Sequence, residues 1–150
     1  MANNTKIRLM IVGIGPHAKR AYIPHLLKLR KEIDVQISAI VELKETEVVT
    51  KEYFKSLSLA PRQIFIDRLS DDTLPQNVQL SLNQIVNDLD INALIIASEP
   101  QTHKQFALWG LERGLHILMD KPVSTQVNAV SNEKSAQNIL RDYQEILEAY

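Results

Sequence analysis

The chain has 150 residues and no cysteine, and its 17 lysine and arginine side chains nearly balance 18 aspartate and glutamate side chains. The near-neutral charge excludes the basic footprint of a protein that binds nucleic acid or an anionic membrane. The lack of cysteine excludes disulfides and thiolate metal sites. No apolar run approaches the ~20 residues that a membrane helix needs, so we expect a cytoplasmic protein with neither nucleic acid nor membrane as a partner.

Strand-like apolar runs alternate with stretches of helical period, beginning at residues 6–15 (KIRLMIVGIG). This run is almost continuously apolar, as expected for a strand covered on both faces. A helix is predicted over residues 16–32, because Pro16 is tolerated in a first helical turn. Pro24 lies inside this pattern and should kink or restart the helix.

The rest of the chain continues the alternation. The pattern predicts strands at 34–43, 63–67, 91–98 and 115–120; helices at 44–57, at 81–90 capped by Ser81, at 101–114 closed by Gly114, and from about Asn128 to the end; and an irregular connection at 68–80. Repeated strand–helix alternation predicts an α/β fold, a doubly wound parallel sheet of about five strands with right-handed crossovers. The last helix has an apolar face and stops without a breaker, so we expect the chain to be the N-terminal part of a longer protein.

A glycine-rich turn joins the first strand to the first helix. Gly13, Gly15 and Ala18 have the G-x-G-x-x-(G/A) spacing, in which the first glycine allows a tight turn, the second lets backbone approach a pyrophosphate and the third position keeps helix and sheet close. The free N–H groups at the start of that helix suit a diphosphate. We therefore predict that this turn, with Pro16 and His17, binds a dinucleotide, and the alternative is a glycine turn that only packs.

Glu42 ends the second strand, 29 positions after Gly13. An acid at that place can accept hydrogen bonds from the adenosine ribose and repels a 2′-phosphate, which favours NAD over NADP. Lys44 lies close enough to soften that repulsion, so NADP remains possible. The alternative is that Glu42 is a solvated residue at the start of a helix.

Polar residues follow the fourth and fifth strands. In a doubly wound sheet the carboxyl ends of both strands lie beside the glycine turn, so Ser98, Glu99, Asp120 and Lys121 should converge near the nicotinamide half of a dinucleotide. A lysine there can assist proton transfer while hydride leaves the same carbon. Pro122 would fix the turn, through a cis bond in one reading, and hold Lys121 in position.

The segment IASEPQTHKQFALWGLERGLHILMDKP, together with GIGPHA, resembles the Gfo/Idh/MocA family, the glucose–fructose oxidoreductase and inositol dehydrogenase group. The residues that match the family pattern are His103, Ala107, Leu111, Gly114, His116, Lys121 and Pro122. The resemblance implies that residues 1–150 form the NAD(P)-binding Rossmann domain of an oxidoreductase. Its substrate would be a sugar, a polyol or a related hydroxyl or carbonyl compound.

The resemblance also assigns roles to residues. It implies that Lys121 is the catalytic lysine, that Gly13, Gly15 and Ala18 hold the cofactor, and that Glu42 binds the ribose. The family's second domain, which supplies most substrate contacts and the usual homo-oligomer interface, is not in this chain. We therefore expect the 150 residues to bind a cofactor without catalysing a reaction.

Two residues depart from the family pattern. Asp120 replaces the usual glutamate, and Glu99 stands where proline or asparagine is usual. His103 is a candidate cofactor-binding residue, and its alternative role is that of a packing residue whose polar atoms are hydrogen-bonded. No metal site is predicted, because no histidine or carboxylate pair has ligand spacing.

Two other functions stay open. The first alternative function is a non-catalytic dinucleotide sensor or scaffold. The second, a flavodoxin-like regulatory domain, would want acidic residues rather than glycines after the first strand.

Overall fold

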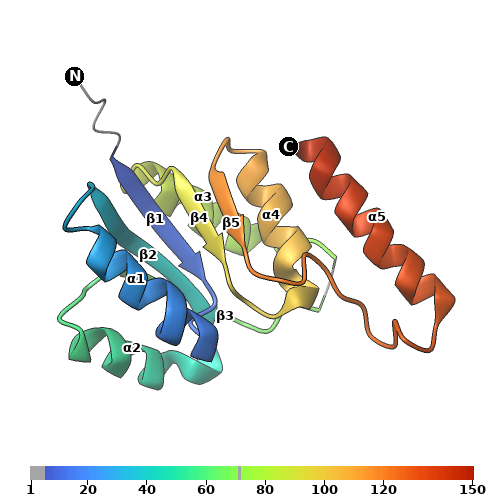
Figure 1. The fold of residues 1–150 in the computed structure, drawn as a ribbon, viewed down its shortest axis with the longest axis horizontal. Coiled ribbons are helices and arrows are strands. Elements are labelled where there is room, and N and C mark those ends of the chain that lie inside the picture. The colour runs from blue at the N-terminus through green and yellow to red at the C-terminus, as the bar shows by residue number, and fades with distance from the viewer. Residues whose placement is uncertain (1–5, 71) are drawn as a thin grey trace.

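Five parallel strands form the centre of the molecule in a computed structural model that describes residues 6–70 and 72–150 (Figure 1). The strands are β1 (Ile7–Val12), β2 (Val35–Leu43), β3 (Arg62–Ile66), β4 (Ala93–Ile96) and β5 (His116–Met119). Their order in the sheet is β3-β2-β1-β4-β5, and every neighbouring pair is parallel. The predicted doubly wound parallel sheet is therefore confirmed, and its order reverses between β1 and β4.

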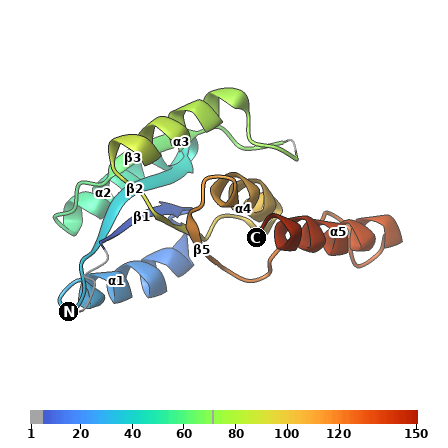
Figure 2. The ribbon, with the colours of Figure 1, turned by 90° about the horizontal axis from the view of Figure 1, so that it is seen from above.

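Helices cover both faces of this sheet. They are a π-helical turn (Ala18–Tyr22) that runs into α1 (Ile23–Leu29), then α2 (Glu47–Ser56), α3 (Gln76–Asp88), α4 (His103–Leu111) and α5 (Glu133–Ala149). Seen from above, α3 lies on one side of the sheet and α1 on the other (Figure 2). The predicted irregularity at Pro24 is confirmed, since the helix changes from π to α geometry one residue before it.

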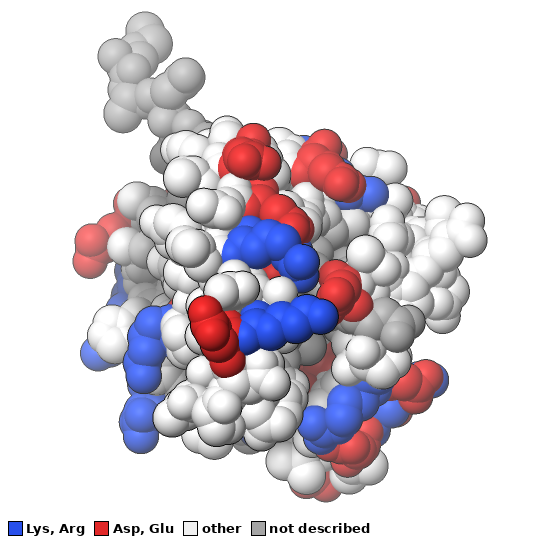
Figure 3. Space-filling model, turned by 90° about the vertical axis from the view of Figure 1, so that its right-hand side faces the viewer, with Lys and Arg blue, Asp and Glu red and all other residues white. Residues whose placement is uncertain are grey.

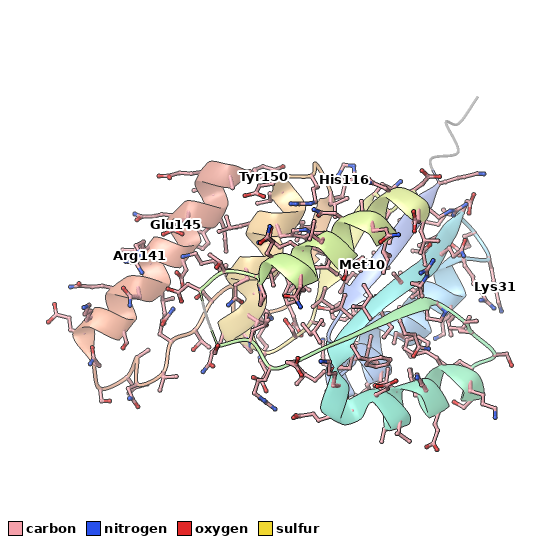
Figure 4. The ribbon with its side chains drawn as sticks, turned by 180° about the vertical axis from the view of Figure 1, so that it is seen from behind. Met10, Lys31, His116, Arg141, Glu145 and Tyr150 are labelled. Atoms are coloured by element: carbon pink, nitrogen blue, oxygen red, sulfur yellow. The ribbon has the colours of Figure 1, made fainter. Side chains whose placement is uncertain are left out.

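Alternate side chains of β1 pack into two separate hydrophobic cores, one on each face of the sheet. Leu9 and Ile11 pack on the α1 and α2 side, with Phe54 of α2. Met10 and Val12 pack on the α3 and α4 side, and Figure 4 shows Met10 beneath α3. Because both faces of β1 are buried from Leu9 to Val12, these four consecutive residues are all apolar rather than apolar at every second position.

The last helix, α5, stands beyond α4 at one end of the molecule (Figures 1 and 2). It is held by Lys104 of α4, whose ammonium lies 2.9 Å from Asp142 and 2.6 Å from Glu145. Leu140, Tyr143 and Leu147 on the same helix are more than half exposed. Acidic and basic side chains are interspersed on this end of the molecule, as Figure 3 shows.

Two predicted helix boundaries are wrong. Helix α3 begins at Gln76 with Pro75 as its N-cap, so residues 76–80 are not irregular and Ser81 lies inside the helix. The buried residues Val78, Leu82 and Ile85 show why, because their i, i+4, i+7 spacing places one stripe against the core. Within the predicted irregular stretch, residue 71 lies outside the described residues.

The second wrong boundary is the start of α5. The predicted start at Asn128 fails because this residue has a φ of 61°, a left-handed conformation that a right-handed helix does not contain. The helix starts instead at Glu133, after Asn132, whose side chain accepts a hydrogen bond from the Ser135 N–H. Among the described residues, no helix is both long enough and apolar enough to cross a membrane.

Candidate cofactor cleft

The two glycines of the turn after β1 have different reasons to lack a side chain. Gly13 has a φ of +86°, and a Cβ on it would lie 2.5 Å from the Ser98 backbone nitrogen. The backbone geometry at residue 13 therefore requires glycine whether or not a ligand binds there. Around Gly15, a Cβ would meet no protein atom within 4 Å. Open space at Gly15 leaves its backbone accessible to a ligand, whereas Ala18, in the helical turn that follows, is buried.

Glu42, at the end of β2, is tied to the glycine turn. Its Oε2 accepts a hydrogen bond from the Ile14 N–H at 2.6 Å, and its Oε1 accepts one from the Leu43 N–H at 2.7 Å. Each carboxylate oxygen has a second lone pair that these bonds do not use. Glu42 thus orients the turn and keeps acceptor capacity toward the cleft in front of it.

A cleft of about 580 Å³ opens along the carboxyl edge of the sheet. It is bounded by the glycine turn and by the segments that follow β2, β3 and β4. Of the predicted site residues, those that line it are Gly13, Gly15, Pro16, Glu42, Ser98 and Glu99. A cleft at the point where the strand order reverses is where open α/β sheets bind their ligands.

The segment after β4 is organised by its own hydroxyl groups. Thr102 Oγ1 donates to the Glu99 carbonyl at 2.9 Å, and the Ser98 hydroxyl lies 2.8 Å from the same Oγ1. His103 begins α4 and is fully buried. Its Nδ1 lies 2.9 Å from the Pro122 carbonyl and its Nε2 lies 3.0 Å from the Ser98 carbonyl. The imidazole is therefore enclosed by backbone and joins the tips of β4 and β5.

Asp120 and Lys121 follow β5 on the same edge of the sheet. The Asp120 N–H donates to the Ile96 carbonyl of β4, and its Oδ1 accepts from the Lys121 N–H at 2.9 Å. The other carboxylate oxygen lies 3.8 Å from His17 Nε2 in the helical turn after the glycines. This contact places the glycine turn and the Asp120–Lys121 pair beside each other, and the peptide bond before Pro122 is cis.

Tyr22 completes this group at the β5 end. Burial raises the pKa of its phenol, and the neighbouring Asp120 raises it further through its negative charge and a hydrogen bond. The ring of Tyr22 also meets the edge of the His17 ring, with the centroids 5.2 Å apart. Asp120 is thus held by three neighbours, Tyr22, His17 and the Lys121 backbone.

Six predicted site residues lie outside the walls of the cleft, namely His17, Ala18, His103, Asp120, Lys121 and Pro122. Among them, Lys121 is exposed on the shared edge, Ala18 is buried, and the His103 ring is enclosed. Sequence reasoning missed Arg68 and Glu45, which do line it. Arg68 follows β3, so the rule that all carboxyl ends share one edge, applied to the third strand as it was to the others, would have found it.

Charged side chains concentrate at the β2–β3 end of the cleft. Arg68 contacts Glu45 at 2.6 Å and Glu99 at 3.1 Å, and Lys44 contacts Asp67 at 2.7 Å. Hydrogen bonds to Glu45 and Glu99, followed by their charges, raise the pKa of Arg68 above its ordinary value. Within residues 6–70 and 72–150, no group of three or more histidine, aspartate or glutamate side chains is placed to hold a metal ion.

Comparison with known families places this geometry in context. Residues 7–146 match the Gfo/Idh/MocA family model, described as "Oxidoreductase family, NAD-binding Rossmann fold". A search of curated protein sequences found no relative of the chain.

Solved structures show the same fold at low sequence identity. The WlbA dehydrogenase from Bordetella pertussis, solved in complex with NADH and UDP-GlcNAcA, is 16% identical with a TM-score of 0.59; the alignment covers 95% of this chain and 36% of that one. A putative dehydrogenase from Bordetella bronchiseptica RB50 is 22% identical, with a TM-score of 0.57 and coverages of 95% and 30%. KijD10, a 3-ketoreductase from Actinomadura kijaniata in complex with NADP, is 17% identical, with a TM-score of 0.55 and coverages of 94% and 36%. The chain thus spans about a third of the length of these structures.

Proposed function

Because the chain belongs to the Gfo/Idh/MocA oxidoreductase family with its NAD-binding Rossmann fold, we propose that it is the dinucleotide-binding domain of an NAD(P)-dependent oxidoreductase. The observation that carries the proposal is the position of Gly15, whose open side faces a cleft that extends to Glu42. In this proposal the pyrophosphate lies against the backbone at Gly15, and the adenosine ribose donates hydrogen bonds to Glu42. The nicotinamide half then points along the sheet edge toward Ser98 and Asp120.

The bound dinucleotide supplies the hydride acceptor or donor. Lys121 transfers the proton: when a hydroxyl-bearing carbon gives up hydride, its hydroxyl proton passes to the neutral amine of Lys121, and in the reverse reaction the resulting ammonium returns the proton to the carbonyl oxygen. Asp120 is a positioning residue, since its carboxylate holds the Lys121 backbone and is itself held by Tyr22 and His17. Lys121 is exposed, so a substrate or a further part of the protein can reach it.

The proposed substrate is a small molecule with an oxidisable hydroxyl or a reducible carbonyl, of the sugar or polyol class. Two solved structures of the same fold support this class, since one is a dehydrogenase with a bound nucleotide sugar and the other is a 3-ketoreductase. In the longer protein that we propose, the remaining length would supply most substrate contacts and the interface between copies. The 150-residue chain then binds cofactor without turnover.

One observation favours a second candidate, a dinucleotide sensor without catalysis. Lys121 does not line the cleft, although it shares the sheet edge with it. The two candidates separate at this residue. An enzyme needs the Lys121 side chain for proton transfer, whereas a sensor needs only the cleft.

The proposal is tested in two steps. Titration of NADH into the 150-residue chain, followed by calorimetry, should give saturable binding; a chain that binds neither NADH nor NADPH contradicts the proposal. In the longer protein, Lys121→Ala should lower kcat by about 10²–10⁴-fold, the usual contribution of a positioned acid–base group, and leave NADH affinity within about twofold. Lys134→Ala, at an exposed position in α5, is the matched control. Intact NADH binding with no turnover in the unmodified longer protein favours the sensor, and unchanged turnover in Lys121→Ala contradicts the role of Lys121 in proton transfer.

A further inference from the structure

A chain of ion pairs crosses the β2–β3 end of the cleft. Arg68 follows β3, Glu45 follows β2 and Glu99 follows β4. In the sheet order β3-β2-β1-β4-β5, β3 and β4 lie on either side of the β2–β1 pair. The guanidinium of Arg68 therefore reaches across the ends of two strands to contact both carboxylates, at 2.6 Å and 3.1 Å. We call Arg68, Glu45 and Glu99 the strap.

All three members of the strap line the cleft itself. Glu42, the proposed partner of the adenosine ribose, lines the same end. The strap thus lies where the 2′-position of an adenosine would come if its ribose were bound to Glu42. This step rests on the proposed function.

A second cation near this end, Lys44, is also paired with a carboxylate. Lys44 follows β2 directly, and its Nζ lies 2.7 Å from Asp67 Oδ2. Three carboxylates are thus paired with two cations near this end of the cleft: Glu45 and Glu99 with Arg68, and Asp67 with Lys44.

We infer that the strap selects NAD over NADP, with Glu45 and Glu99 as the specificity-determining residues. An arginine beside the ribose is what accommodates a 2′-phosphate in NADP-binding proteins. Here both terminal nitrogens of the guanidinium already donate to carboxylates, one to Glu99 and the other to Glu45. A phosphate monoester carries a charge of about −1.5 to −2 at pH 7, and it would have to displace Glu45 and Glu99 and then remain beside them. The two hydroxyls of an NAD ribose bring no such charge.

The strap contributes little to folding, which makes it accessible to mutation. Its three side chains are each more than half exposed, and exposed ion pairs contribute little to the stability of a fold. Replacing the carboxylates should therefore leave the fold intact and change the charge that a 2′-phosphate meets. The selectivity and the stability of the chain can thus be varied separately.

The test compares NADH and NADPH by titration into the 150-residue chain. In the unmodified chain, the dissociation constant of NADH should be about tenfold or more below that of NADPH. Glu45→Gln/Glu99→Gln should narrow that ratio by about tenfold, because Arg68 is then free to bind the phosphate. Adding Arg68→Ala to this variant should remove the gain. The control, Glu47→Gln/Glu112→Gln, removes two exposed charges whose partners, Lys51 and Arg113, lie outside the cleft, and should leave the ratio unchanged.

The outcomes separate the inference from the proposed function. Equal affinity for both cofactors, a preference for NADPH, or an unchanged ratio in Glu45→Gln/Glu99→Gln would overturn the selectivity while NADH binding still supports the proposed function. A shift of the ratio by the control as large as that by the double variant would also overturn it, since any loss of negative charge would then suffice. Failure of the unmodified chain to bind either cofactor would overturn the proposed function, and the inference with it.

Discussion

The carboxylate of Glu42 accepts a hydrogen bond from the backbone N–H of Ile14 at 2.6 Å, so the acid after β2 holds the glycine turn after β1. A second bond, from the Leu43 N–H at 2.7 Å, fixes the other carboxylate oxygen. The residue assigned to ribose recognition is therefore also part of the scaffold. Its loss should affect folding and cofactor binding together.

Glu42→Ala should lower the free energy of unfolding by about 1.5–3 kcal/mol, the range for hydrogen bonds to charged groups. Urea denaturation monitored by circular dichroism measures this change. Glu52→Ala, at an exposed position in α2, is the control and should change stability by less than about 0.5 kcal/mol. A Glu42→Ala variant as stable as this control would show that the two backbone bonds contribute nothing.

The two turn glycines should separate folding from binding. Gly13→Ala places a Cβ 2.5 Å from the Ser98 backbone at a φ of +86°, and we expect a cost of about 2–5 kcal/mol from backbone strain and overpacking combined. Gly15→Ala meets no protein atom within 4 Å and should leave the urea midpoint nearly unchanged while weakening NADH binding. Equal stability losses in the two variants would contradict this division of roles.

Asp142 is a buried carboxylate that fastens α5 to the segment after Lys121. It accepts hydrogen bonds from Lys104 at 2.9 Å, from the Ser124 hydroxyl at 2.7 Å and from Gln126 at 2.9 Å. Asp142→Ala leaves a largely buried ammonium with one fewer partner and should destabilise the chain by about 3 kcal/mol. Hydrogen exchange should then accelerate first in α5. Glu148→Ala, exposed on the same helix, is the control, and unchanged protection of α5 in Asp142→Ala would contradict the assignment.

The same cluster predicts how the docking of α5 depends on pH. Burial alone raises the pKa of Asp142, but the hydrogen bonds from Lys104, Ser124 and Gln126 outweigh it, so the pKa lies below the ordinary 3.8. Burial alone lowers the pKa of Lys104, and the bonds to Glu145 and Asp142 raise it above 10.5. The lowered pKa of Asp142 stabilises the folded chain above pH 3.8, and this stabilisation is lost as the pH falls through the pKa of the folded state. The raised pKa of Lys104 stabilises the folded chain below pH 10.5, and this stabilisation is lost as the pH rises through the pKa of the folded state.

Protection of the α5 amides against exchange, corrected for the intrinsic rate, should thus be greatest between these limits. Asp142→Ala should flatten the acid limb of that profile. An acid limb that persists unchanged in the variant would assign the pH dependence to other carboxylates.

His103 should act through the structure of the strand tips. Its ring is fully buried between the Ser98 and Pro122 carbonyls. His103→Leu therefore removes the ring N–H that donates between these carbonyls, at a cost of about 1–3 kcal/mol. Thermal and urea unfolding measure that cost, and His116→Leu, exposed on β5, is the control. A His103→Leu variant that unfolds like the control would show that the two contacts of the His103 ring do not stabilise the fold.

The sequence predicted the elements whose signals are local and strong. The five strands, the closing of α4 near Gly114 and the turn at Gly13 follow from apolar runs and glycine positions, which the tertiary structure does not override. The start of α3 was missed because Asp, Pro and Asn before it resemble a loop, although Val78, Leu82 and Ile85 already show helical spacing. The start of α5 was missed because a left-handed Asn128 gives no signal in a single sequence.

The edge rule for parallel sheets brought Glu42, Ser98, Glu99 and Asp120 to one rim from sequence alone. It could not give pairings between side chains. Which carboxylate holds Arg68, and which backbone groups surround His103, depends on rotamers and on segments that come together only in the folded chain.

The proposed function requires a dinucleotide in the cleft beside Gly15, and mapping NADH onto the ¹⁵N-labelled chain by NMR detects its position residue by residue. We expect saturable shifts at the amides of Gly13, Ile14 and Gly15 and at those of Ser98 and Glu99. The groove around Arg8, Gln36 and Arg62, which none of the cleft residues line, should remain unshifted. Saturable shifts confined to that groove, or no saturable shift anywhere up to millimolar NADH, would contradict the proposed function.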